Sequence, residues 1–294
     1  VAKARQGDAA TVPALVALTR DDTIPLWRAS AAILLQRWAG QPQVSAALLQ
    51  ALRDTDPMVR HMAVRSLETL TGSDARVAAE VRRLLDDPIR LVRVQAAWAL
   101  RTSVDTNSIA GRDLLTFLYN GADHAGGAMQ LGIFLFDRGR IEQALFWFRR
   151  AIGWDGNSAP FRDTIAVVLS QVGRSEEAVQ QLEAACRLAP REAVYRYRLG
   201  LALNEVRRLD LAVKSLEEAV KLDPLFAQAW YNLGLGYAQQ NLLEPSLEAL
   251  KKAERLMPAS PQVPYARATV LIRLGRSGEA TEAMRRSESL RIPQ

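Results

Sequence analysis

The chain has 294 residues, of which 49% are hydrophobic and 24% are charged, with a formal net charge of +6. These proportions are typical of a globular protein and exclude a disordered one. Lys and Arg are scattered without a basic block, which argues against a nucleic-acid partner. No uncharged apolar run approaches the length of a membrane-spanning helix, so we expect no membrane insertion. Apolar residues recur at helical spacing without strand-like alternation, which predicts an all-α fold.

Three segments in the first part of the chain repeat one another, at residues 22–35, 54–70 and 86–100. Each contains an Asp, then an Arg, a small residue and a Leu at matched spacing. The matched positions are Asp22, Asp54 and Asp87; Arg28, Arg60 and Arg93; Ala31, Ala63 and Ala96; and Leu35, Leu67 and Leu100. This register resembles short bacterial HEAT-like repeats, which are pairs of helices. We therefore predict about three such repeats in residues 1–105.

The repeated arginines have two interpretations. They could form a row that binds anions or nucleic acid. Alternatively, each Asp could pair with the turn between helices and with the Arg of the next repeat, which would fix the stacking of the repeats. We favour the second interpretation, because ion-pair networks of this kind are commonly structural.

The segment that follows, residues 102–123, fits neither this register nor the next one. It carries glycines and a Ser/Thr/Asn cluster, which are typical of a break between repeats. We predict a joint at residues 106–123 with one helix over roughly 110–120. That helix should be partly buried, because Leu114, Leu115, Leu118 and Tyr119 share one face.

Residues 124–294 repeat with a period of 34. A column of small residues contains Gly132, Ala166, Gly200, Gly234 and Ala268, and a column of large ones contains Phe148, Leu182, Leu216, Leu250 and Met284. The best-matching unit has Trp230, Leu233-Gly234, Tyr237, Leu250, Ala253 and Pro258. This order resembles the tetratricopeptide repeat (TPR), a helical hairpin. We predict about five TPRs, so the whole chain would be an α-solenoid: a HEAT-like array followed by a TPR superhelix.

Two residues of that unit need an interpretation of their own. Gly234 and Gly236 resemble part of a phosphate-binding loop, but they lie in a helical pattern with no preceding strand, so we interpret Gly234 as a packing contact. Trp230 is expected to fill the core between hairpins, and its truncation to Ala would then cost ~3–5 kcal/mol, as for a large buried aromatic.

The sequence contains few residues that could form a catalytic, metal or cofactor site. Cys186 is the single cysteine, and the two histidines, His61 and His124, are far apart in the sequence. Neither histidine has a metal-ligand partner at a familiar spacing, and no nucleotide-binding, hydrolase or haem-attachment motif occurs. We expect no enzyme activity, no metal site and no cofactor in this chain.

The resemblance to TPRs implies a binding surface instead, because the first helix of each unit lines a concave groove in that fold. Its groove positions, transferred to this sequence, give Asp163, Tyr197, Arg198, Asn204, Tyr231, Asn232, Gln239, Tyr265 and Arg273. Three of these are tyrosines at intervals of 34 residues, and tyrosine gives a large contact area at low entropic cost. We expect position 5, that of Tyr231, to point away from the inter-repeat core. The alternative is that the tyrosines only cover neighbouring helices.

Some TPR modules grip the acidic tail of a chaperone through a clamp of Lys, Asn and Arg. The corresponding positions here are Met129, Ile133, Val194 and Arg198, so only the Arg remains. A chaperone-tail function is therefore not predicted.

The tandem of HEAT-like and TPR arrays resembles the C-terminal region of bacterial multihaem c-type cytochrome proteins. That resemblance implies an exported, periplasmic protein with a haem-bearing part before this tandem; the residues themselves leave the compartment unknown. The chain starts at Val1 in mid-helical pattern, without Met or a signal peptide, which we take as the start of a fragment of a longer protein.

Two functions follow. The first is a non-catalytic scaffold that binds a protein or peptide segment in the TPR groove. The alternative is an accessory docking or assembly region of a larger electron-transfer protein, with its haems outside this chain. Its partner would then be a redox protein or a second copy of itself.

Overall fold

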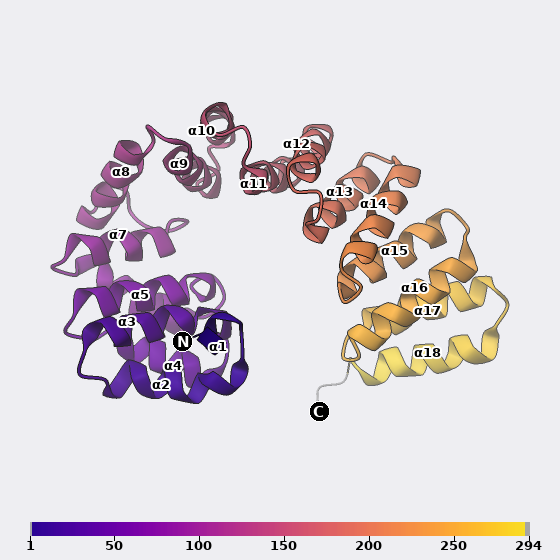
Figure 1. The fold of residues 1–294 in the computed structure, drawn as a ribbon, viewed down its shortest axis with the longest axis horizontal. Coiled ribbons are helices and arrows are strands. Elements are labelled where there is room, and N and C mark those ends of the chain that lie inside the picture. The colour runs from indigo at the N-terminus through magenta and orange to yellow at the C-terminus, as the bar shows by residue number, and fades with distance from the viewer. Residues whose placement is uncertain (1, 292–294) are drawn as a thin grey trace. The chain divides into compact units, whose positions relative to one another are not determined.

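The computed structural model describes residues 2–291, and every regular element in this range is a helix (Figure 1). Contacts divide the chain into two compact units, Val1–Trp154 and Asp155–Gln294. The division falls after the first hairpin of the predicted TPR array. The predicted boundaries at 105, 106, 123 and 124 stay predictions, and their outer limits, Val1 and Gln294, lie outside the described residues.

The first unit is a series of short helices. Its α-helices are α1 (Ala2–Arg5), α2 (Val12–Asp21), α3 (Pro25–Leu34), α4 (Pro42–Ala51), α5 (Pro57–Leu67), α6 (Ala75–Arg83), α7 (Arg90–Ala99), α8 (Ile109–Gly121), α9 (Ala125–Asp137) and α10 (Ile141–Trp154). Its 3-10 helices are η1 (Ala9–Thr11), η2 (Gln36–Trp38), η3 (Glu68–Leu70) and η4 (Leu84–Asp86). Pro25, Pro42 and Pro57 begin α3, α4 and α5. Proline suits a first helical position, where no intrahelical N–H bond is lost.

The HEAT-like helices pack in two rows, and α3, α5 and α7 contact one another in sequence. Their core contains the Leu column of the sequence repeat, with Leu35 and Leu67 fully buried and Leu100 at 4% exposure. Ser66 of α5 donates a hydrogen bond of 2.9 Å from Oγ to the carbonyl oxygen of Ala32 in α3. The position of Ser66 therefore faces the preceding repeat.

The repeated arginines form structural ion pairs. Arg28 donates from Nε and Nη2 to the carboxylate of Asp54 at 2.7 and 2.8 Å. Arg60 binds Asp87 in the same way at 2.7 and 2.9 Å. Arg93 completes the series with Asp113 on α8, at 2.7 Å. We call these three pairs the aspartate–arginine ladder.

The predicted direction of the ladder was wrong. Each Arg reaches forward to the Asp of the next element, whereas we expected each Asp to bind the Arg of the next repeat. The reason lies at the start of each helix, where Arg28 also donates from Nη1 to the carbonyl oxygen of its own repeat's Asp22 at 2.9 Å. Arg60 does the same to Asp54 at 2.8 Å. The backbone of one Asp thus positions the Arg that binds the next Asp.

The predicted joint contains α8, whose bounds extend the expected helix by one residue at each end. Leu114 and Leu118 are buried and Leu115 is half-buried, but Tyr119 is 54% exposed. Tyr119 therefore lies at the exposed edge of the shared face. The turn from α8 to α9 is tight, since a Cβ on Gly127 would lie 1.6 Å from the carbonyl oxygen of Gly121.

The second unit consists of four helical hairpins. They are α11 (Ala159–Gln171) with α12 (Ser175–Leu188), α13 (Ala193–Glu205) with α14 (Leu209–Leu222), α15 (Ala227–Gln239) with α16 (Leu243–Leu256), and α17 (Gln262–Arg273) with α18 (Ser277–Ser289). A Cβ on Gly234 would lie 2.7 Å from Cγ of Leu250, which confirms that this glycine is a packing contact. The glycine is required because the two helices of the hairpin approach closely there.

Trp230 does not fill the core. Its side chain is half-buried against the cluster that contains Val213 and Leu216, and its Nε1 donates to the carbonyl oxygen of Pro224 at 3.0 Å. The indole N–H needs a polar partner, and the partner at the edge of the hairpin holds the ring part-way out of the core.

Candidate functional site

The predicted groove residues all lie on the first helices of the four hairpins in the second unit. Asp163 is on α11; Tyr197, Arg198 and Asn204 are on α13; Tyr231, Asn232 and Gln239 are on α15; Tyr265 and Arg273 are on α17. Within the unit, α12, α14, α16 and α18 form the second row. The surface of the first helices is called the first-helix surface below.

Successive first helices are connected by polar contacts between two repeat positions: groove position 5, which holds Asp163 and Tyr197, and the position after it, which holds Arg198 and Asn232. The Arg198 guanidinium on α13 forms an ion pair with the Asp163 carboxylate on α11. One repeat later, Asn232 Nδ2 on α15 donates to the Tyr197 hydroxyl on α13 at 3.2 Å. The same two repeat positions therefore connect two pairs of helices. They form a continuous polar row over three hairpins.

The three tyrosines differ in exposure. Tyr197 is half-buried, its ring centroid is 4.8 Å from that of Phe226, and burial raises the pKa of its hydroxyl. Tyr231 is half-buried against the cluster around Leu247 and Leu250, so the expectation that its position points away from the inter-repeat core was wrong. A 34-residue period fixes the helix face of a residue, and on α15 that face also borders the next hairpin.

Tyr265 is the most accessible of the three, with 48% of its surface exposed. The Arg291 guanidinium lies 5.6 Å from the centre of its ring, a cation–π distance. Arg273 on the same helix reaches back to the preceding repeat, where it donates to the Ala238 carbonyl oxygen at 2.8 Å and to Asn241 Oδ1 at 2.9 Å. An exposed aromatic ring therefore lies on the last of the four first helices.

Three predicted amide side chains line one small cavity formed by α13, α14 and α15. Asn204, Asn232 and Gln239 contribute to this cavity of about 60 Å³, together with apolar residues such as Leu201 and Leu235. Asn204 and Gln239 are exposed, and their side chains make no hydrogen bond among residues 2–291. Side-chain amides can donate to and accept from a peptide backbone.

Sequence analysis missed a charged cavity of about 310 Å³ in the last two hairpins. It is lined by Lys251, Glu254, Arg255, Pro258, Arg267 and Arg286. Glu254, at 5% exposure, forms ion pairs with Arg267 and with Arg286, the latter at 3.1 Å. A Glu in the apolar phase of α16 was the available signal, because a buried carboxylate requires cationic partners.

The cysteine and the histidines, which were the candidates for reactive or metal-binding groups, do not form a common site. Cys186 is buried, and burial raises the pKa of its thiol to about 11, which keeps it protonated at neutral pH. His124 caps α9 by accepting a hydrogen bond from the Gly127 N–H at 3.2 Å. Across the part of the chain that the structure describes, no group of three His, Cys, Asp or Glu residues could hold a metal ion. No described helix is long and apolar enough to cross a membrane.

Family models match both arrays. The HEAT repeat model matches residues 12–101, and tetratricopeptide repeat models match residues 159–192 and 197–264. The chain is therefore an α-solenoid of helical hairpins in which HEAT repeats precede TPRs. Among curated protein sequences no match is found.

Solved structures of TPR proteins resemble part of this chain. MamA from Desulfovibrio magneticus RS-1 is 26% identical with a TM-score of 0.54, and the match covers 57% of this chain and 95% of that one. YrrB, described as a TPR protein with an unusual peptide-binding site, is 20% identical with a TM-score of 0.52, covering 60% of this chain and 91% of that one. These likenesses show the fold, a solenoid of helical hairpins.

Proposed function

We propose that the chain is a non-catalytic scaffold that binds a protein or peptide segment on the first-helix surface of its second unit. The observation that carries this proposal is the polar row through Asp163, Arg198, Tyr197 and Asn232, which runs across successive hairpins. The exposed Tyr265 lies on the next first helix, α17. A ligand that crosses several repeats would meet equivalent groups at each step. The peptide-binding site named for YrrB supports the same use of the fold.

The ligand would be an extended segment or a single helix. The amides of Asn204 and Gln239 are available to its backbone, since neither side chain has a hydrogen-bond partner in the described part. Tyr265 would provide the aromatic contact, because it is exposed and the other two groove tyrosines pack against their own neighbours. The alternative function, an accessory region of a multihaem cytochrome, rests on resemblance of the sequence alone.

The test is selection of peptides from a displayed random library against the whole chain, followed by measurement of their dissociation constants. Tyr265→Ala should weaken the binding of a selected peptide by ~1–3 kcal/mol, the range for an aromatic anchor at an interface. Tyr119→Ala is the matched control, because Tyr119 is a similarly exposed tyrosine on α8. The fold of both variants is checked by circular dichroism.

Hydrogen exchange locates the bound peptide. Protection should appear on α13, α15 and α17. The proposal fails if peptides protect α12, α14, α16 and α18 instead, or if Tyr265→Ala and Tyr119→Ala change affinity equally.

A further inference from the structure

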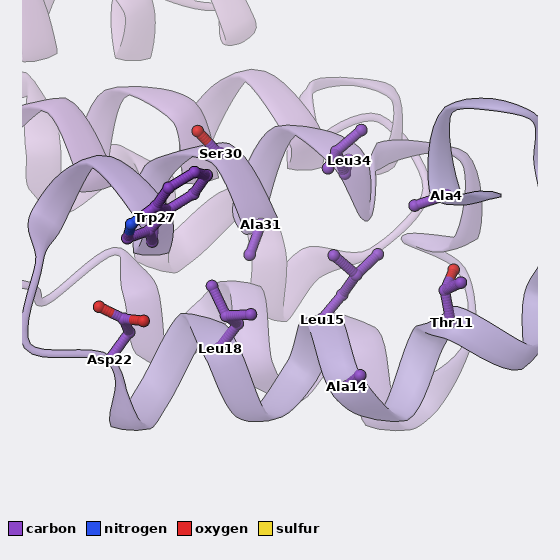
Figure 2. Close-up of a pocket in the computed structure, with 10 residues that line it drawn as sticks. All are labelled: Ala4, Thr11, Ala14, Leu15, Leu18, Asp22, Trp27, Ser30, Ala31 and Leu34. Atoms are coloured by element: carbon purple, nitrogen blue, oxygen red, sulfur yellow. The ribbon is translucent and has the colours of Figure 1, made fainter. Parts of the chain in front are cut away.

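The junction between the last two hairpins of the second unit carries an open cavity of about 310 Å³ whose lining is almost entirely charged. By contrast, a cleft of about 380 Å³ formed mainly by α2 and α3 has a mostly apolar lining, with Asp22 as its single charged residue (Figure 2). The charged cavity is lined by Lys251, Glu254, Arg255, Pro258, Arg267 and Arg286. None of the predicted groove residues is among them, so the cavity is separate from the first-helix surface.

The 34-residue period shows that this junction differs from the two before it. Glu254 on α16 occupies the position of Val220 on α14. Arg267 on α17 occupies the position of Leu233 on α15. Val220 and Leu233 belong to one apolar cluster and are 6% and 2% exposed. The equivalent residues one junction earlier, also buried, are Cys186 and Leu199. A carboxylate and a guanidinium thus replace an apolar contact in the third junction of the unit.

The charged pair at this junction is buried and only partly satisfied. Glu254 accepts a hydrogen bond from Arg267, while the Arg286 Nε lies 3.1 Å from its Oε1. Arg267 Nε is buried and has no hydrogen-bond partner among residues 2–291. A buried ion pair is seldom more stabilising than well-packed apolar residues of similar volume. Packing of the hairpins therefore gives no reason for these charges, and an unsatisfied buried donor on a residue that lines a cavity points to a ligand.

The rim of the cavity is accessible. Arg255 is exposed, and its side chain forms no ion pair or hydrogen bond within the described part of the chain. Its repeat equivalents, Lys221 and Arg187, are also exposed, although further hairpins follow them in the array. The exposure of this position is therefore a property of the repeat and does not depend on where the sequence ends.

The charge of the lining favours an anion with several oxygens. Four cations and one carboxylate give it a formal charge of +3. Glu248, outside the lining, pairs with Lys251 at 2.8 Å, which leaves the three arginines around Glu254. Guanidinium groups bind phosphate through pairs of hydrogen bonds, and a phosphoryl group carries about −1.5 to −2 charges and three acceptor oxygens. A carboxylate, with one charge and two oxygens, matches this lining less well.

We propose that the cavity binds a phosphoryl group, either as free phosphate or as a phosphate ester. Arg267 Nε and the guanidinium groups of Arg255 and Arg286 would donate hydrogen bonds to its oxygens. Glu254 would hold Arg267 and Arg286 in place at the cavity. The proposal is independent of peptide binding on the first-helix surface.

Isothermal titration calorimetry of the whole chain at constant ionic strength tests the proposal. The probes are inorganic phosphate, phosphoserine with both termini blocked as the ester, and acetate. Phosphate or the ester should bind saturably, and acetate should bind about tenfold more weakly or worse, because it lacks the second charge and the third oxygen. The tighter of the two phosphate probes identifies the source of the phosphoryl group. The proposal is overturned if neither binds, or if acetate binds equally well.

Arg255→Gln removes a cation from the rim without leaving a buried charge unpaired. It should weaken phosphate binding about tenfold or more, because charge-assisted hydrogen bonds are lost. Lys221→Gln is the matched control, since Lys221 is the exposed equivalent of Arg255 beside the apolar junction. It should leave the affinity unchanged. Equal effects of the two changes would show a response to overall charge alone and would contradict the site.

A double variant separates binding from packing. Glu254→Val combined with Arg267→Leu gives this junction the residues of the preceding one, so the fold should be retained, as checked by circular dichroism. Phosphate binding should be abolished. Retained affinity in the folded double variant would overturn the proposal, since phosphate would then bind elsewhere. If the double variant does not fold, the comparison of Arg255→Gln with Lys221→Gln decides the question.

Discussion

Gly234 shows how one missing methyl group sets the spacing of a hairpin. Its Cα lies so close to α16 that a Cβ would be 2.7 Å from Leu250 Cγ and 2.9 Å from Cδ2. Leu250 is fully buried. The periodic column of small residues predicted this contact correctly.

The clash made by a Cβ at Gly234 should cost ~1–3 kcal/mol, the usual cost of overpacking a core. Ala recovers about 1 kcal/mol of this as the better helix former, so we expect Gly234→Ala to destabilise the protein by up to about 2 kcal/mol. Gly278→Ala is the control: it is also helical, has no atom within 4 Å of a built Cβ, and should leave stability unchanged or raise it. Urea unfolding measures both. Equal shifts of the two midpoints would refute the packing argument.

Asp87 makes the most buried pair of the aspartate–arginine ladder, with side-chain exposures of 4% for Asp87 and 11% for Arg60. Asp87→Asn should cost ~3–5 kcal/mol, because it leaves a buried guanidinium without its carboxylate. Glu80→Gln breaks pairs with the exposed Arg53 and Arg83 and should cost at most ~1 kcal/mol. Chemical denaturation of the two variants checks the ranking.

The same pair predicts a pH dependence. Burial would raise the pKa of Asp87, but hydrogen bonds from Arg60 and from the Ile89 N–H lower it below its ordinary value. A carboxyl with a lowered folded-state pKa stabilises the protein above the unfolded pKa of about 3.9, and this contribution disappears as the pH falls through the folded value. The stability difference between the unaltered chain and Asp87→Asn should therefore be constant near neutral pH and shrink below pH ~4. An unchanged difference in acid would contradict the assignment.

At the scale of the helix, the sequence period predicted where the helices lie and which residues they carry. It did not predict what packs against each side chain. It placed the groove residues on α11, α13, α15 and α17, and it placed α8 to within one residue at each end. It could not show that Tyr231 borders the next hairpin, because periodicity gives the face of a helix and not what lies against its edge. The direction of the ladder was missed for a similar reason, since Asp and Arg at matched spacing fit pairing either way.

Trp230 on α15 is a second residue whose surroundings the sequence period did not predict. Because the ring is half-buried, Trp230→Ala should cost ~1–3 kcal/mol, less than the ~3–5 kcal/mol for a fully buried aromatic. Trp230→Phe, which keeps most of the ring but removes the hydrogen bond to Pro224, should cost less than Trp230→Ala. Thermal unfolding of the pair measures both, and a loss above ~4 kcal/mol for Trp230→Ala would restore the core assignment.

At the scale of the molecule, each hairpin of a solenoid contacts only its neighbours, so stability is a sum of local terms. The single thiol, Cys186 on α12, offers a local reporter because it is buried and reacts only when its surroundings open. The adjacent helix α13 carries Gly200, where a Cβ would lie 2.7 Å from Leu216 Cγ. One hairpin further on, Gly234 has the same contact with Leu250.

Gly200→Ala should therefore speed alkylation of Cys186 more than Gly234→Ala does. The rate is followed by mass spectrometry of the native protein with iodoacetamide. Equal acceleration by the two substitutions would show that the second unit opens as one body, against the local account.

The aspartate–arginine ladder has a polarity that bears on how such a chain can lengthen. Every HEAT hairpin brings an acceptor for the hairpin before it and a donor for the element after it. Suppose that residues 54–86 were duplicated in tandem. Arg28 would then pair with Asp54 of the first copy, Arg60 of the first copy with Asp54 of the second, and Arg60 of the second copy with Asp87. Such a duplication would leave every Asp and Arg of the ladder paired. An inserted hairpin that lacked the Asp would leave the preceding guanidinium buried without a partner, and one that lacked the Arg would leave the following carboxylate buried without a partner. The array can therefore lengthen by duplication of its own hairpins without loss of ion pairs in the ladder.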